Sequence, residues 1–292
     1  MMDEGKSYKT AGAFRAALEA RLQSRARETG IDLQRLRRQV AFDRFLGRMF
    51  SKGPKADYPW VLKGGYAMEL RTHFARATRD IDFTLHARTR LPKGSREKRE
   101  HVRGMLQQAA GTHFDDYFEF LIGEAREDLD GAPEGGNRYP VEARMDGREF
   151  ARFHVDMGIG DEVLQPLDVV KGEDWLNFAG VKASSFPVIS AAQQFAEKLH
   201  AYTFRRRERV NTRTKDLIDM ILLMRGGKLD RHKVGAAIRA TFTKRATHRL
   251  PSALEEPPAD WESVFNALAR ECNLVMSLQE GFQLVRDFVQ TV

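Results

Sequence analysis

The chain has 292 residues, of which 42% are hydrophobic and 30% charged, a balance that excludes a disordered protein and allows a sizeable core. Its single cysteine, Cys272, excludes an internal disulfide and a cysteine zinc site. No apolar run approaches the ~18 residues of a membrane span, and the polar N-terminus lacks a signal peptide's apolar segment, so we expect a cytoplasmic protein with no membrane partner. The net charge of +7 favours a polyanionic partner modestly.

The N-terminal residues 11–52 have a helical pattern. Apolar residues recur at i+4 from Phe14 onward, Gly30 ends a first helix, and Asp32 is a candidate N-cap for a second. The basic side chains of the second helix are interpreted as a solvated face; they are Arg35, Arg37 and Arg38.

A strand–turn–helix follows. Trp60-Val61-Leu62 is short, apolar and stopped by Gly64-Gly65, and helical spacing resumes after the glycines. A glycine pair lets the backbone approach a ligand closely, and a helix N-terminus offers free N–H groups to an anion. The pattern indicates a phosphate-binding turn, although most glycine pairs are ordinary turns.

The segment Asp80-Ile81-Asp82-Phe83-Thr84-Leu85 alternates polar and apolar residues, as a half-buried strand does. Asp80 and Asp82 therefore share one face. Two carboxylates held this close repel unless a cation lies between them, and hard oxygen ligands suit Mg²⁺ carrying phosphate oxygens. Together with the glycine turn, the aspartate pair predicts a nucleotidyl-transfer site. Without that turn, the pair could simply be the polar side of an edge strand.

The rest of the first half contains a basic segment, residues 88–103, running into a helix that ends near Gly111, and a strand over 117–122. After a glycine- and acid-rich loop over 128–137, two alternating runs meet at Asp146-Gly147, a strong hairpin signal. Asp156 becomes a third candidate metal ligand if the second run lies beside Asp80 and Asp82, whereas His154 is taken as an ordinary strand residue.

Strand signals disappear after Pro187, which predicts a mixed-sheet domain over 1–185 and an all-helical domain over 186–292. Lys198 lies at the border of an apolar helix stripe, where it either reaches solvent or is held in a site. Asp216, in the first turn of the next helix, could simply complement the helix dipole, and His200 is taken as a packing residue.

Four motifs in this order resemble the AbiEii/AbiGii group of bacterial nucleotidyltransferase toxins, especially its MenT-like members. The resemblance extends over about residues 33–225 and is carried by Leu62-Lys63-Gly64-Gly65, Arg79-Asp80-Ile81-Asp82-Phe83, Ala196-Glu197-Lys198-Leu199-His200-Ala201 and Lys215-Asp216-Leu217-Ile218-Asp219. It implies an α+β fold: a DNA polymerase β-like nucleotidyltransferase core followed by a helical lobe that closes the active-site cleft.

The resemblance also implies roles for individual residues. Asp80 and Asp82 would hold metal, and Lys63 with Gly64-Gly65 would cradle the triphosphate. Lys198 would reach the nucleotide from the helical lobe, with Asp216 as the acidic partner across the cleft. Many relatives carry Ser or Thr after the glycines, so Tyr66 is a departure that could alter nucleotide binding.

Similar proteins add nucleotides, often pyrimidines, to tRNA 3′ ends and block aminoacylation, and they are paired with an AbiEi-type antitoxin. We therefore expect a Mg²⁺-dependent toxin that uses an NTP and modifies tRNA or another RNA. The alternatives are transfer to a protein hydroxyl, and a non-catalytic RNA- or partner-binding module, which Tyr66 alone favours. Arg205, Arg206, Arg207 and Arg209 are expected to hold RNA, and phosphorylation of Thr78 is expected to obstruct the nucleotide.

Overall fold

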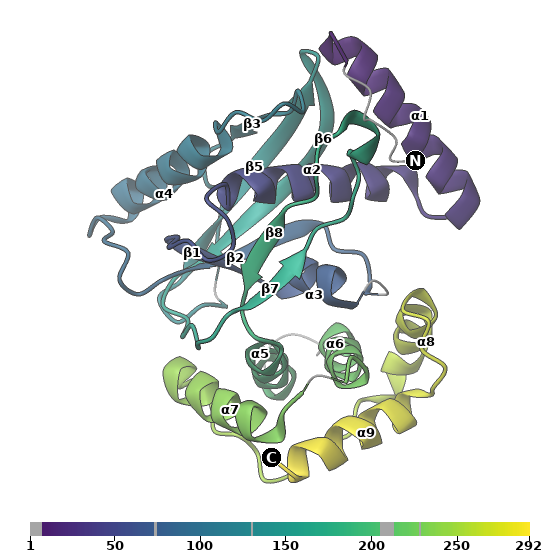
Figure 1. Cartoon of the computed structure of the whole chain (residues 1–292). Helices are drawn as coiled ribbons and strands as arrows, with labels where there is room; N and C mark the ends of the chain where they lie inside the picture. The colour runs from purple at the N-terminus through teal and green to yellow at the C-terminus, as the bar shows by residue number, and fades with distance from the viewer. Residues whose placement is uncertain (1–7, 73–74, 130, 205–212, 228) are drawn as a thin grey trace.

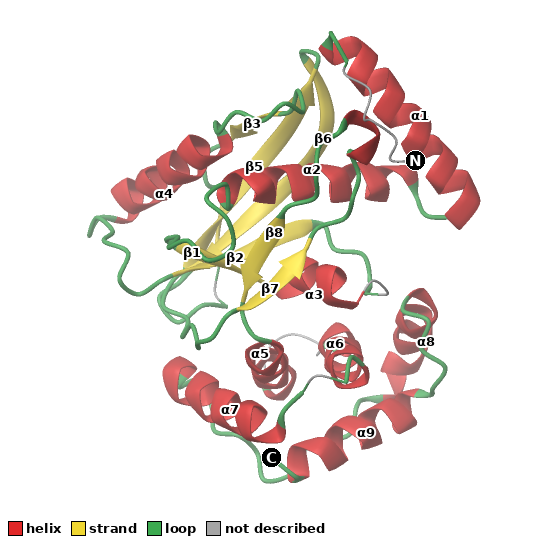
Figure 2. Cartoon of the chain, in the orientation of Figure 1, coloured by secondary structure: helices red, strands yellow, loops and turns green. Residues whose placement is uncertain are grey.

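The computed structural model describes residues 8–72, 75–129, 131–204, 213–227 and 229–292. Figure 2 shows a sheet with helices α1–α4 around it, and a second group containing only helices. The helices are α1 (Ala11–Thr29), α2 (Leu33–Met49), α3 (Gly64–Thr72), α4 (Ser95–Ala110), α5 (Ala191–Thr203), α6 (Thr214–Arg225), α7 (Arg231–Arg245), α8 (Glu262–Glu271) and α9 (Leu278–Gln290). The strands are β1 (Trp60–Lys63), β2 (Asp80–Leu85), β3 (Glu119–Ile122), β4 (Glu127–Asp128), β5 (Gly136–Met145), β6 (Arg148–Gly158), β7 (Asp168–Lys171) and β8 (Ser185–Val188).

The two N-terminal helices begin and end where the sequence predicts. The Thr10 side chain accepts from the Ala13 N–H at the start of α1, and Gly30 ends that helix in the left-handed conformation. The Asp32 side chain accepts from the Arg35 N–H and caps α2.

The strands form one mixed sheet, ordered β3-β5-β6-β2-β1-β8-β7, with β4 paired to β5. β1 and β2 are antiparallel, β2 and β6 are parallel, and β8 runs parallel to β1. The α+β fold with a mixed sheet and flanking helices is therefore confirmed. The strand β7 and a 3₁₀ turn at Asn177–Ala179 fall in the region 160–185, where no clear sequence pattern predicts an element.

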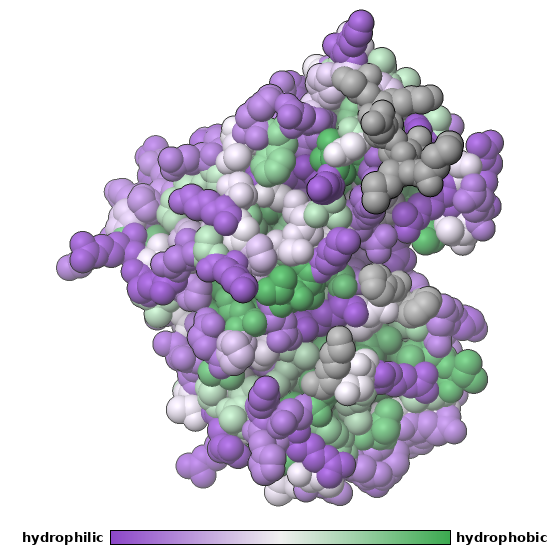
Figure 3. Space-filling view, in the orientation of Figure 1, coloured by the Kyte–Doolittle hydropathy of each residue, from purple (hydrophilic) through white to green (hydrophobic). Residues whose placement is uncertain are grey.

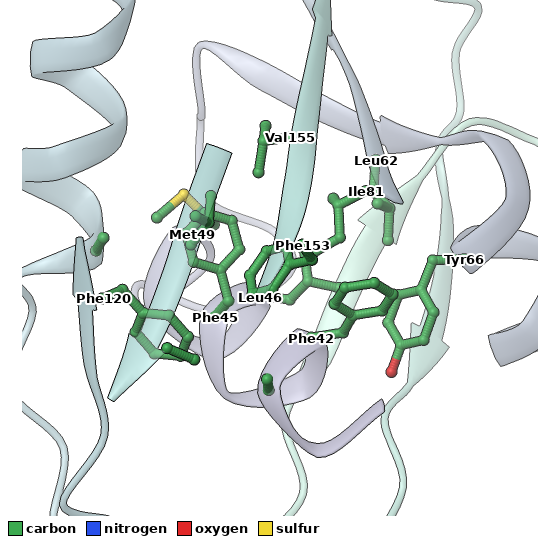
Figure 4. Close-up of a cluster of buried hydrophobic side chains, with 14 of the residues drawn as sticks. Phe42, Phe45, Leu46, Met49, Leu62, Tyr66, Ile81, Phe120, Phe153 and Val155 are labelled. Atoms are coloured by element: carbon green, nitrogen blue, oxygen red, sulfur yellow. The ribbon is translucent and has the colours of Figure 1, made fainter. Parts of the chain in front are cut away.

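Helix α2 covers the apolar face of the sheet (Figure 1). Phe153 of β6 meets the rings of Phe42 and Phe45 edge-on, with centroids 4.9 and 5.5 Å apart. Ile81 of β2 and Val155 of β6 point into the same cluster (Figure 4). Because side chains alternate along a strand, this packing leaves the polar residues of β2 and β6 on the opposite face.

A buried ion cluster ties α2 to the segment before β3. Arg44 Nε lies 2.7 Å from one Asp116 oxygen, and Arg48 Nη2 lies 2.6 Å from the other. Burial alone would raise the pKa of the Asp116 carboxyl, but the two guanidiniums lower it below its ordinary value. The charge is therefore compensated inside the core.

The hairpin between β5 and β6 turns at Asp146-Gly147, as predicted. Both residues have positive φ, 57° and 67°, the backbone of a type I′ turn. A bulge shifts the register between Ala143 and Arg144.

Helices α5–α9 pack around a second hydrophobic cluster, which Met68 of α3 joins. The expected division after residue 185 falls at the start of β8, which still belongs to the sheet, so we propose that the helical domain begins after Val188. Hydrophilic side chains cover much of the visible face of the molecule (Figure 3). No described helix combines the length and the apolar character that crossing a membrane requires.

Candidate active site

A cleft of about 520 Å³ lies between the polar face of the sheet and the helical domain. Seven basic and five acidic side chains line it, so the cleft carries an excess of positive charge. The lining residues are Lys63, Gly64, Gly65, Arg76, Thr78, Asp80, Asp82, Arg138, Asp156, Gln194, Glu197, Lys198, Ala201, Arg213, Lys215, Asp216 and Arg245.

The glycine turn lies directly against Asp82. Gly64 begins α3 with φ +70°, and a Cβ at that position would lie 1.9 Å from Asp82 Oδ2. A Cβ on Gly65 would lie 2.7 Å from Thr78 Oγ1. The Gly65 N–H donates to Asp82 Oδ2 (3.3 Å), so the first turn of α3 points its free N–H groups at the carboxylate side of the cleft. Only glycine fits here, for reasons of both conformation and space.

The register of β2 against β6 places Asp82 opposite Asp156 and Asp80 opposite His154. Strands β2 and β6 are therefore neighbours, which is the condition for Asp156 to be a third candidate metal ligand. Burial, and then the neighbouring Asp156, raises the pKa of Asp82 to about 6. His154, taken from the sequence as an ordinary strand residue, instead lies with Nδ1 3.2 Å from Asp80 Oδ1.

Arg138 of β5 neutralises part of the carboxylate group, a role that the sequence analysis missed. It makes two hydrogen bonds to Asp156, of 2.8 and 2.7 Å, and its Nη2 lies 3.4 Å from Asp80 Oδ2. Within the described ranges, no group of three His, Cys, Asp or Glu side chains is arranged to hold a metal ion. Asp82 has no cationic partner within ion-pair distance among the described residues. Asp80 and Asp82 together offer hard oxygen donors that fit a divalent cation such as Mg²⁺.

Lys63, at the end of β1, belongs to a second ion cluster. Its ammonium contacts Asp161 and lies 3.6 Å from Glu197 Oε2. Arg245 of α7 contacts the same two carboxylates, at 2.9 and 3.6 Å. Burial would lower the pKa of Lys63, but Glu197 and Asp161 outweigh burial and raise it, so the lysine stays charged. The sequence analysis did not single out Asp161 or Arg245.

Lys198 of α5 and Asp216 of α6 are brought together by the helical domain. Lys198 Nζ lies 3.1 Å from Asp216 Oδ1 and 2.8 Å from Asp219 Oδ2. Arg76 holds Asp219 from the other side through two hydrogen bonds, of 3.1 and 3.0 Å. Burial opposes the charge on Lys198, but Asp219 and Asp216 raise its pKa. Lys198 is thus a fixed cation at the cleft and does not extend into solvent.

Tyr66 does not reach the cleft, contrary to the expectation that its bulk would alter nucleotide binding. Its side chain is only 2% exposed, and its hydroxyl donates to Asp43 of α2 (2.7 Å). The helical rotation of α3 points Tyr66 into the core, while Gly64 and Gly65 face the cleft. Only its backbone could contact a ligand.

Gln194 of α5 supports the turn. Its Nε2 donates to the Gly64 carbonyl (2.8 Å), and its Oε1 accepts from Arg71 Nε (3.1 Å). His200 is buried, as predicted for a packing residue, and contacts Thr247 at 2.9 Å. The arginines expected to hold RNA, Arg205, Arg206, Arg207 and Arg209, lie outside the described residues.

The chain is similar to known proteins in its sequence profile and in its fold. The sequence profile of the family described as "Nucleotidyl transferase AbiEii toxin, Type IV TA system" matches residues 44–283. No curated protein matches the sequence. The fold is similar to that of MenT4, a nucleotidyltransferase toxin from Mycobacterium tuberculosis H37Rv, with a TM-score of 0.53 at 16% identity over 94% of this chain and 97% of that one. A second solved structure, a nucleotidyltransferase described as putative from H. pylori, aligns with a TM-score of 0.44 at 15% identity over 89% and 95% of the two chains. Because the profile spans most of the sequence, the chain belongs to the AbiEii family of nucleotidyltransferase toxins of type IV toxin–antitoxin systems.

Proposed function

We propose that the protein transfers a nucleotide from an NTP to the 3′ end of an RNA, with tRNA as the expected acceptor, and so blocks translation. The observation that carries this proposal is the contact between the glycine turn and Asp82: the Gly65 N–H lies 3.3 Å from the carboxylate. A phosphate seated on that turn is next to the residues proposed to hold metal. Cytoplasmic location, an AbiEi-type antitoxin partner and a preference for a pyrimidine NTP remain part of the proposal.

The chain's own residues would divide the work of binding the nucleotide. The first N–H groups of α3 would receive phosphate oxygens, because they have no partner within the helix. Lys63 and Lys198 would neutralise the charge that develops on the leaving pyrophosphate. Both ammonium groups are already fixed by carboxylates, Lys63 by Asp161 and Lys198 by Asp216 and Asp219, so little reorganisation is needed.

Asp80 and Asp82 are the proposed metal ligands, with Asp156 as a third that Arg138 engages in this structure. Mg²⁺ held there would polarise the α-phosphate and activate the attacking hydroxyl. The reaction forms a phosphodiester bond to that hydroxyl and breaks the bond to pyrophosphate.

The proposal of a non-catalytic module loses its one supporting feature. It rested on Tyr66, which packs in the core and leaves the glycine turn open to the cleft. Transfer to a protein hydroxyl uses the same site, so the acceptor must be identified by experiment.

The test is incubation of the protein with each α-labelled NTP, Mg²⁺ and total RNA, beside a protein fraction as the competing acceptor. Asp80→Ala is compared with Asp260→Ala, which removes an exposed carboxylate of the helical domain. We expect label in RNA with the wild type and Asp260→Ala and none with Asp80→Ala, while thermal unfolding stays similar. Label in the protein fraction alone, or no label at all, would refute transfer to RNA.

A further inference from the structure

A second groove, of about 730 Å³, adjoins the cleft. Asp80 and Arg138 line both this groove and the cleft, so the two cavities meet at one of the proposed metal ligands, Asp80. The remaining wall comes from α2, the segment before β2, and strands β3, β5 and β6. Its residues include Arg38, Arg79, Leu121, Arg126, Pro140 and Arg152.

Among the described residues, three arginine side chains of this groove have no carboxylate within ion-pair distance. Within the part of the chain that the structure describes, Arg38, Arg79 and Arg126 make no side-chain hydrogen bond or ion pair, and Arg38 Nε is buried without a hydrogen-bond partner. Burial, and then the Arg79 guanidinium, lower the pKa of Arg38 by more than Asp32 and Glu69 raise it. The sequence analysis interpreted Arg38 as part of a solvated face.

The acidic residues of the groove do not compensate this charge. Besides Asp80, the wall contains Glu142, which is held by Arg144 at 2.6 Å and by Arg152 at 3.6 Å. Arg152 is itself paired with Glu149 at 2.8 Å. Unpaired guanidiniums that line one groove are stabilised by an external anion, and phosphate matches their planar donor geometry.

The position of the groove indicates which phosphate it binds. In phosphoryl transfer the attacking and leaving oxygens are roughly in line, so the acceptor must approach from the side opposite the pyrophosphate. The proposed pyrophosphate side is the glycine turn with Lys63 and Lys198. The arginine groove shares Asp80 with the cleft but is lined by neither the glycine turn nor Lys63 or Lys198, so an acceptor lying in it would reach Asp80 from a side other than that of the pyrophosphate.

We propose that this groove binds the phosphodiester backbone next to the terminal hydroxyl of the RNA acceptor, with Arg38, Arg79 and Arg126 as the phosphate-binding residues. The inference rests on the proposed function and adds to it the path of the acceptor. A terminal base would pack on Leu121, whose side chain is 48% exposed at the groove.

The test compares two charge-reversed variants of equal net charge. Arg79→Glu/Arg126→Glu changes two exposed arginines in the groove, and Arg231→Glu/Arg270→Glu changes two exposed arginines on α7 and α8. The probe is a fluorescent single-stranded RNA ending in a 3′-deoxynucleotide, which binds without reacting, measured by anisotropy over a series of salt concentrations. KM for NTP and KM for extendable RNA are measured on the same proteins.

We expect the groove variant to bind the probe at least about tenfold more weakly and to reduce the slope of log K against log salt by about 1.4, since two contacts to single-stranded phosphate are lost at roughly 0.7 each. KM should rise for RNA and not for NTP, and the α7–α8 variant should resemble the wild type. Equal binding by the two variants, or no RNA binding by the wild type, overturns the inference. If the wild type transfers label to RNA while both variants bind alike, the groove assignment fails and the proposed function stands. If no RNA is labelled, the proposed function fails, and the binding data still decide the groove.

Discussion

Replacing Gly64 with alanine tests the geometry on which the site depends. With φ at +70°, a non-glycine residue costs about 1–2 kcal/mol in strain. The new Cβ would also lie 1.9 Å from Asp82 Oδ2, so the carboxylate must move by roughly 1 Å or more. Moving it gives up the hydrogen bond from the Gly65 N–H, a charged bond that contributes about 1.5–3 kcal/mol. We therefore expect Gly64→Ala to lose about 3 kcal/mol of unfolding free energy.

Gly30 provides a matched control. It has φ +71°, and a Cβ there meets nothing within 4 Å, so Gly30→Ala carries the strain without the clash. In urea unfolding we expect this variant to lose about 1–2 kcal/mol and to keep full nucleotide transfer. Gly64→Ala should reduce transfer by at least about 100-fold, because a proposed metal ligand is displaced by about 1 Å.

A double-mutant cycle separates strain from clash. In an Asp82→Gly background, the new Cβ of Gly64→Ala no longer meets a side chain. Gly64→Ala should then lower the unfolding free energy only as much as Gly30→Ala does. An equal cost of Gly64→Ala in both backgrounds, or an active Gly64→Ala enzyme, would show that the turn does not press on Asp82.

Three other predictions concern charges, two of them buried in the core and one introduced at the cleft. Asp116→Asn should lower the unfolding free energy by about 3–5 kcal/mol in thermal or urea unfolding, because it leaves Arg44 and Arg48 buried and uncompensated; a loss below about 1 kcal/mol would contradict this. Burial raises the pKa of Asp43 to about 7, so its contribution to stability is complete below about pH 4 and is lost as the pH rises to 7. The unfolding free energy of Asp43→Asn, measured relative to that of the wild type, should therefore rise by up to about 4 kcal/mol between pH 4 and pH 7. A difference in unfolding free energy that does not change with pH would refute the raised pKa of Asp43. Thr78→Glu should reduce nucleotide transfer at least about tenfold, because it places a negative charge against the glycine turn, whereas Thr78→Val should not; equal activity of the two variants would remove the proposed phosphorylation switch.

Much of the fold could be predicted because its signals are local. The strand–turn–helix at Gly64-Gly65, the alternation around Asp80 and Asp82, and the hairpin at Asp146-Gly147 are each formed by residues that are neighbours in the sequence. The family resemblance, confirmed by the profile match over residues 44–283, supplied the order in which these pieces combine.

The partners of the site residues could not be predicted, because they are distant in sequence. Lys63 meets Asp161 across 98 positions, and Arg245 reaches the same carboxylate across 84. Arg138 shows a subtler obstacle. Counting back from the Asp146-Gly147 turn places it opposite Val155, on the apolar face. The bulge near Arg144 shifts the register by one and places Arg138 opposite Asp156.

The hydrogen bond from Gln194 to the Gly64 carbonyl joins residues 130 positions apart. A ribosome must therefore extend the chain past Gln194 before this support for the glycine turn can form. Arg245, which holds Asp161 beside Lys63, is made later still. Fragments released before that point would contain Asp80 and Asp82 but lack the residues that hold the glycine turn and Lys63 in place, so we expect such fragments to be inactive in nucleotide transfer.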